Sequence, residues 1–157
     1  MGISFIVRKT LPLLALLLAV SCARPVSDEF FTKVSAKPQS GRYVFELALE
    51  DADLAYDVDI YIPCASDRRS LQPFSEDVLM EWQAPSGTKY QETVVFSSDT
   101  QTQESFFSRT YLYHYREGLV PVEHGTWILR MKFPSDFEKK NKANGIGVRL
   151  IRNNGTR

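Results

Sequence analysis

The sequence predicts an all-β protein: an antiparallel β-sandwich of about seven to eight strands that follows an N-terminal lipoprotein signal peptide. Apolar and polar residues alternate with a period of two in seven runs, which are rich in β-branched and aromatic residues. Turn residues such as Gly, Pro and Asn separate many of these runs. After the signal, no long stretch has the apolar stripe of a helix, which argues against a parallel α/β sheet.

The N-terminal segment is typical of a bacterial lipoprotein signal. Arg8 and Lys9 precede an apolar run of about ten residues, and the small residues Ala19-Val20-Ser21 then lead to Cys22. We expect residues 1–21 to be removed and the Cys22 thiol to carry lipid, with palmitate or similar acyl chains as the membrane anchor. The run is shorter than the roughly 20 residues that a spanning helix needs. An ordinary secretory signal with an incidental Cys is the alternative.

Cleavage would leave 136 residues, a length that fits one domain. Residues 22–41 are expected to be a lipidated tether, because Pro25, Pro38 and Gly41 interrupt any regular pattern. The sandwich domain is then expected to span residues 42–157.

The short acidic stretch Ser27-Asp28-Glu29 lies close behind the lipidated Cys. Some bacteria use such a patch to route lipoproteins to the cell surface, and a solvated linker is the alternative. We expect the protein in the outer membrane or elsewhere in the cell envelope, on the periplasmic or the surface face.

The charge balance gives no support for binding to nucleic acid. Without Arg8 and Lys9, the mature chain has 17 of the 19 basic residues against 19 acidic ones, a formal net charge of −2. This balance provides no surplus of basic residues that would favour binding to nucleic acid or to anionic lipid. The lipid would therefore anchor the protein without help from charge.

The alternating runs follow one another along the chain as seven expected strands. They comprise residues 43–50, 56–62, 78–83, 90–96, 111–116, 127–133 and 146–151. In the sixth run, Trp127 is expected in the core and Arg130 in solvent, because they lie on opposite faces.

The connections carry turn chemistry. Pro85-Ser86-Gly87 separates the third and fourth runs at hairpin spacing, and Asn144-Gly145 precedes the last run. The segment 134–143 is expected to hold one helical turn, capped by Ser135 or Asp136.

Candidate chemistry is sparse. The chain has two histidines, His114 and His124, and no G-x-S-x-G nucleophile motif, so we expect no catalytic residues, no metal and no cofactor. His114 is expected to be a solvated or hydrogen-bonded strand residue. Cys64 is expected to be a small residue at a strand end, and it would pair with Cys22 only if Cys22 were not lipidated.

Two clusters allow an alternative interpretation. Four aspartates gather around the expected turn between the first two strands, where a calcium site is the alternative to a solvated face; they are Asp51, Asp53, Asp57 and Asp59. Four aromatic side chains, expected in the core, could instead form an exposed sugar-stacking platform; they are Tyr111, Tyr113, Tyr115 and Trp127.

Three stretches resemble the gliding-motility lipoprotein H family of the Bacteroidota. They are Tyr56-Asp57-Val58-Asp59-Ile60-Tyr61-Ile62, then Glu81-Trp82-Gln83-Ala84-Pro85-Ser86-Gly87, then Tyr115-Arg116 with the two segments 125–131 and 145–150. With Cys22, the resemblance covers roughly residues 22–152. It departs from the family at 100–108, which is polar where the family carries a Gly-Trp-x-Gly-type segment. The resemblance implies a lipid-anchored envelope protein with a β-sandwich fold, and it supplies no catalytic residue.

The expected function is therefore that of a non-catalytic, membrane-anchored envelope lipoprotein, an accessory or scaffold of an envelope protein complex. Its expected partners are the membrane, through lipid, and other envelope proteins. The polar segment 97–104 is the expected docking loop. The alternatives are a surface carbohydrate-binding module, with a glycan as its ligand, and an enzyme or inhibitor with an unrecognised site.

Overall fold

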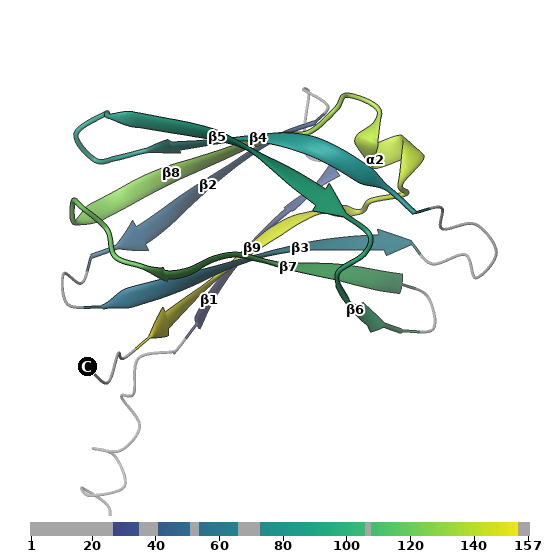
Figure 1. Cartoon of the computed structure of the whole chain (residues 1–157), viewed down its shortest axis with the longest axis horizontal. Helices are drawn as coiled ribbons and strands as arrows, with labels where there is room; N and C mark the ends of the chain where they lie inside the picture. Colours follow the sequence, from purple (N-terminus) through teal and green to yellow (C-terminus); the bar gives the residue numbers. More distant parts are fainter. Residues whose placement is uncertain (1–26, 35–40, 51–53, 66–72, 106–107, 154–157) are drawn as a thin grey trace, which may run out of the picture.

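The structure, a computed structural model, describes residues 27–34, 41–50, 54–65, 73–105 and 108–153. In these ranges, two antiparallel sheets stack face to face as a sandwich, and one short helix lies beside one end (Figure 1). This confirms the predicted fold class.

One sheet has five strands in the spatial order β1-β9-β3-β7-β6. These strands are β1 (Ser27–Lys33), β3 (Ala55–Ala65), β6 (Gln101–Glu104), β7 (Ser108–Leu119) and β9 (Gly145–Asn153). The other sheet has four strands in the order β2-β8-β4-β5. They are β2 (Arg42–Leu49), β4 (Ser75–Gln83), β5 (Lys89–Ser97) and β8 (Gly125–Lys132).

All seven predicted strands are present, and the sixth has the predicted facing. Trp127 is buried, whereas the side chain of Arg130 is 36% exposed and bonds to the Glu81 carboxylate at 2.9 Å. The predicted helical turn is α2 (Phe137–Lys140), and Asp136 occupies its N-cap position without a side-chain hydrogen bond.

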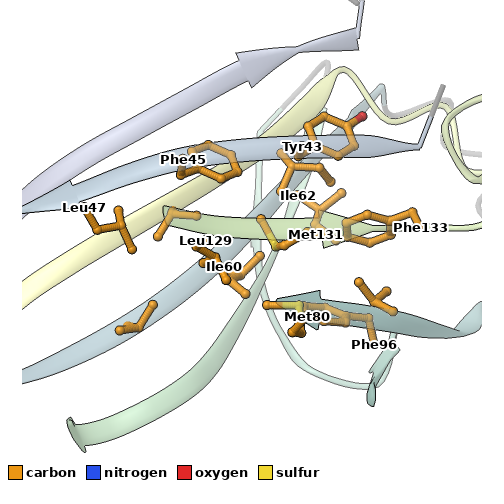
Figure 2. Packing of buried hydrophobic residues seen from close by; sticks show 14 of the residues in the cluster. Tyr43, Phe45, Leu47, Ile60, Ile62, Met80, Phe96, Leu129, Met131 and Phe133 are labelled. Atoms are coloured by element: carbon orange, nitrogen blue, oxygen red, sulfur yellow. The ribbon is translucent and has the colours of Figure 1, made fainter. Parts of the chain in front are cut away.

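The core lies between the sheets and draws on both (Figure 2). Figure 2 shows side chains of β2, β3 and β8 in one cluster with Met80 of β4 and Phe96 of β5. The Tyr43 hydroxyl donates to Glu138 Oε1 at 2.5 Å, which ties α2 to the start of β2. Burial, with the neighbouring carboxylate as a further cause, raises the pKa of Tyr43 well above its usual value.

The prediction of a tether over residues 22–41 is wrong for Ser27–Lys33, because this segment is β1. It pairs with β9 from Ser27 opposite Ile151 to Lys33 opposite Gly145. The sandwich therefore begins at least 15 residues before the predicted boundary at residue 42.

The acidic residues of that stretch are bonded within the sheet. Arg152 donates to Asp28 Oδ2 at 2.6 Å, and Arg149 Nε donates to Glu29 Oε1 at 2.8 Å. Both arginines belong to β9, so the two ion pairs reinforce the β1–β9 ladder. The acidic stretch is thus not a solvated linker.

Two glycines of β9 make room for aromatic rings on the outer face of the five-stranded sheet. A Cβ on Gly147 would lie 2.0 Å from the Tyr61 ring, and a Cβ on Gly145 would lie 2.6 Å from the Phe31 ring. The rings of Phe31 and Tyr61 stack with centroids 6.0 Å apart. Aromatic rings thus cover a strand whose glycines have no side chains to pack.

We predict that Gly147→Ala lowers the free energy of unfolding by about 1–3 kcal/mol, because the new methyl group displaces the Tyr61 ring. The same change should cost far less in a Tyr61→Ala background, because the three nearest atoms to the added Cβ all belong to that ring. Urea titrations of the four proteins in this cycle give the coupling energy.

Gly145→Ala is the matched control. Its Cβ would also meet the backbone oxygen of Thr32 at 2.4 Å, so Phe31→Ala should not rescue it. Equal rescue at both positions, or none at Gly147, would contradict the described packing.

Candidate functional site

A groove opens between the two sheets at one end of the sandwich, on the left in Figure 1, where β2, β4 and β7 end and β5 and β8 begin. We call it the end groove, and its volume is about 320 Å³. Its lining is mostly apolar and aromatic, which is typical of ligand pockets. The lining comprises Leu49, Trp82, Tyr90, Gln91, Glu92, Arg116, Leu119, Val120, Pro121, Val122 and Trp127.

Stacked aromatic rings form one wall of the end groove. Tyr90 stacks on Trp127 with centroids 6.1 Å apart, and Trp127 meets Trp82 edge-on at 6.3 Å. The Trp127 indole N–H donates to the backbone oxygen of Glu123 at 2.9 Å, which fixes the ring. Tyr90 is 47% exposed, so part of this wall is open to a ligand.

Hydrogen bonds through Tyr115 join that wall to the polar part of the lining. The Tyr115 hydroxyl accepts a hydrogen bond from Trp82 Nε1 at 2.8 Å and donates one to Glu92 Oε1. Arg116 also donates to Glu92 Oε1, at 2.5 Å. Burial, and then the bond to Glu92, raises the pKa of Tyr115 to about 12.

The lining of the end groove has the chemistry of a binding site. Among the described residues, Glu92 is the one carboxylate that lines the end groove, and Tyr115 and Arg116 already hold it. Glycoside hydrolysis ordinarily needs two carboxyl groups across the scissile bond. An apolar ring face or alkyl group would fit the aromatic wall, and Glu92 with Arg116 would orient a polar group.

The predicted aromatic platform is split by the structure. Tyr111 and Tyr113 pack toward the core, against Phe74 and Phe96 respectively. Of the four, Trp127 lines the end groove, and Tyr115 stacks on Trp82, which also lines it.

Sequence reasoning missed Trp82 and Tyr90 as site residues. Both lie in the predicted strands 78–83 and 90–96. The available signal was their position on either side of the Pro85-Ser86-Gly87 turn, where an inward side chain reaches the open end of a sandwich.

The structure confirms His114 as a hydrogen-bonded strand residue: its Nδ1 lies 2.7 Å from Oδ1 of the buried Asp59. Asp57 accepts hydrogen bonds from the Gly118 backbone and from the Asn153 side chain. Asp51 and Asp53 lie outside the described residues, so the calcium alternative stays untested there. Within the described ranges, no three His, Cys, Asp or Glu side chains converge as metal ligands.

Cys64 is buried near the end of β3, as predicted, and burial raises the pKa of its thiol to about 11. Such a thiol is a poor nucleophile at neutral pH. Cys22 lies outside the described residues, so its lipidation stays a prediction. No helix in the described ranges has the length and hydropathy to cross a bilayer.

The predicted docking loop 97–104 is not wholly a loop. Its last four residues form β6, an exposed edge strand that pairs with β7. Thr100 Oγ1 donates to the Leu112 backbone oxygen at 2.7 Å, and Tyr113 donates to the Ser97 oxygen at 2.5 Å. These bonds fix the segment against the sheet.

Comparison with known proteins identifies no relative for this chain. No family model matches it, and no curated protein matches it. A crystal structure of a protein from Sulfurospirillum deleyianum is similar, with a TM-score of 0.40 and 10% sequence identity over 84% of this chain and 100% of that one.

We predict that Tyr115→Phe lowers stability by about 1–2 kcal/mol near neutral pH, because it removes the bonds to Trp82 and Glu92. Since the folded state raises the pKa of Tyr115 from 10.0 to about 12, the unfolded state ionises first as the pH rises. The free energy of unfolding of the wild type should therefore fall above pH 10.

The Phe variant should lose less stability than the wild type over the same alkaline range. Urea midpoints at several pH values between about 8 and 11.5 measure the difference, and Tyr90→Phe is the control at an exposed phenol. Parallel curves for the wild type and Tyr115→Phe would contradict the assigned burial of this hydroxyl.

Proposed function

We propose that this chain is a non-catalytic envelope lipoprotein, anchored by lipid on Cys22, that acts as an accessory or scaffold of an envelope protein complex. The resemblance to gliding-motility lipoproteins points to the same class of function. The observation that carries the proposal is the position of β1. This strand starts five residues after Cys22 and is bound to β9 along its whole length.

A lipid on Cys22 would therefore mount the sandwich directly on a membrane. A domain on a long tether samples many orientations, whereas a domain whose first strand follows the anchor presents a restricted set of faces to its neighbours. Confinement near the membrane also raises the effective concentration for partners there.

The chemistry of the described residues supports binding over catalysis. The end groove holds a single, already bonded carboxylate, the Cys64 thiol is buried, and His114 is bonded to Asp59 on the outer face of a sheet. Among the described residues, no hydroxyl or thiol is hydrogen-bonded to His114, as nucleophilic catalysis through this histidine would need.

The edge around β6 is the docking surface that we propose for a partner protein. The side chains of Gln101–Glu104 are exposed, and the strand pairs with the half of β7 that lies away from the end groove. Hydrogen bonds already fix the segment 97–104, so the binding of a partner would cost little conformational entropy in this segment.

A carbohydrate-binding module is the second candidate, favoured by the half-exposed Tyr90 ring on the wall of the end groove. A sugar ring would stack there, and Glu92 or Arg116 would bond to its hydroxyl groups. Binding of an envelope polysaccharide that is lost in Tyr90→Ala and kept in Gln103→Ala would favour this candidate over the first.

The anchor is tested by fatty-acid labelling of cells. We expect the wild type to incorporate label and Cys22→Ser to lose both the label and the membrane fraction. A wild-type protein without label would contradict the lipoprotein assignment.

Docking is tested by a photo-crosslinking amino acid at Gln103, on the β6 edge. We expect one specific crosslinked envelope protein in living cells, and no such product from the exposed Thr93 on the other sheet. The same products from both positions, or none from Gln103, would contradict the proposed docking surface.

A further inference from the structure

The rim of the end groove is unusually apolar for a solvent-facing surface. Val122 is 74% exposed, Val120 is 53% exposed and Tyr90 is 47% exposed. The two valines come from the β7–β8 connection and the tyrosine from the start of β5, so separate segments converge on one apolar rim. A clustered apolar rim above an aromatic groove indicates an interaction site.

This rim lies at the same end of the sandwich as the start of β1. Ser27 is opposite Ile151, Ile151 is opposite Asp57, and Asp57 bonds to the backbone of Gly118. The next residue, Leu119, lines the end groove. Figure 1 shows β1 beginning, and β7 and β9 ending, toward this side of the molecule.

Chain length then limits the orientation of the domain on a membrane. Five peptide steps join Cys22 to Ser27, so their Cα atoms lie at most about 18 Å apart. The 12 residues of β7 extend the sandwich by about 40 Å toward β6. If the β6 end faced the membrane, Ser27 would therefore lie beyond the reach of an anchored Cys22.

The remaining choice is between the end groove and the flank at β1. That flank carries the ion pairs Asp28–Arg152 and Glu29–Arg149, which a lipid surface would desolvate. The end groove presents the exposed Tyr90, Val120 and Val122 at its rim, with the buried Trp82 and Trp127 behind them, and tyrosine is favoured at membrane interfaces. Its charges are mixed in sign, with Glu92 beside Arg116, so this contact does not depend on anionic lipid.

From this geometry we propose that the end groove faces the bilayer and that Tyr90, Val120 and Val122 contact the headgroup region of a zwitterionic lipid surface. The proposal rests on the proposed lipidation of Cys22 and names the surface that the anchored domain presents to the membrane. The β6 edge then points away from the bilayer, toward other envelope proteins.

The experiment uses the mature lipidated protein in phosphatidylcholine vesicles, with and without phosphatidylcholine brominated near the headgroup end of its acyl chains. Bromine quenches tryptophan at short range, and both tryptophans of the chain line the end groove. We expect quenching in the wild type, stronger quenching in Val122→Trp, and no increase over the wild type in Gln103→Trp at the β6 edge. Val122→Asp should lose most of the wild-type quenching while it stays bound to the vesicles.

Vesicle-bound protein with no quenching in the wild type and in Val122→Trp would overturn the inference and leave the lipid anchor standing. That outcome is also what a groove open to a water-borne glycan or a soluble protein would give. Stronger quenching at Gln103→Trp than at Val122→Trp would overturn it too. A wild-type protein that carries no lipid and does not bind vesicles would instead overturn the proposed function, and the inference with it.

Discussion

The pairing of β1 with β9 is the constraint on which the rest of the structure depends. It joins the first described residues of the chain to its last strand, which itself pairs with β3 in the middle of the five-stranded sheet. Phe30 adds its side chain to the core from one face of β1, and Phe31 stacks on Tyr61 from the other. Without β1, β9 would become the edge strand of this sheet and would lose its ion pairs to Asp28 and Glu29.

The same pairing connects the fold to the proposed function. A lipid on Cys22 would lie within five residues of this strand, so membrane attachment would also limit the orientation of the sheet. With the proposed anchor, the end groove would lie toward the bilayer and the polar β6 edge away from it. In the proposed arrangement, the aromatic wall and the bonded Glu92 would form the surface that meets the membrane.

The sequence predicted those elements whose burial is one-sided and regular. The seven alternating runs correspond to β2 to β5 and β7 to β9. They could be predicted because successive side chains of a half-buried strand alternate between the core and the solvent. β1 was not predicted, because Asp28 and Glu29 resemble a solvated linker in the sequence. Their partners Arg149 and Arg152 lie far along the chain and meet them only across the sheet. β6 was not predicted as a strand, because its four exposed polar residues show no alternation of apolar and polar side chains. The site was partly predicted: Trp127 was singled out, but its meeting with Tyr90 and Trp82 depends on strand order, which the local pattern does not encode.

Hydrogen exchange of the mature protein tests the central claim, that β1 is part of the sandwich, most directly. The account predicts that about half of the amides of Ser27–Lys33 exchange slowly, because one edge of the strand bonds to β9 and the other faces solvent. Their protection should fall when Arg149 and Arg152 are both replaced by alanine. Complete exchange of this segment within seconds, at the rate of an unstructured tether, would contradict the claim.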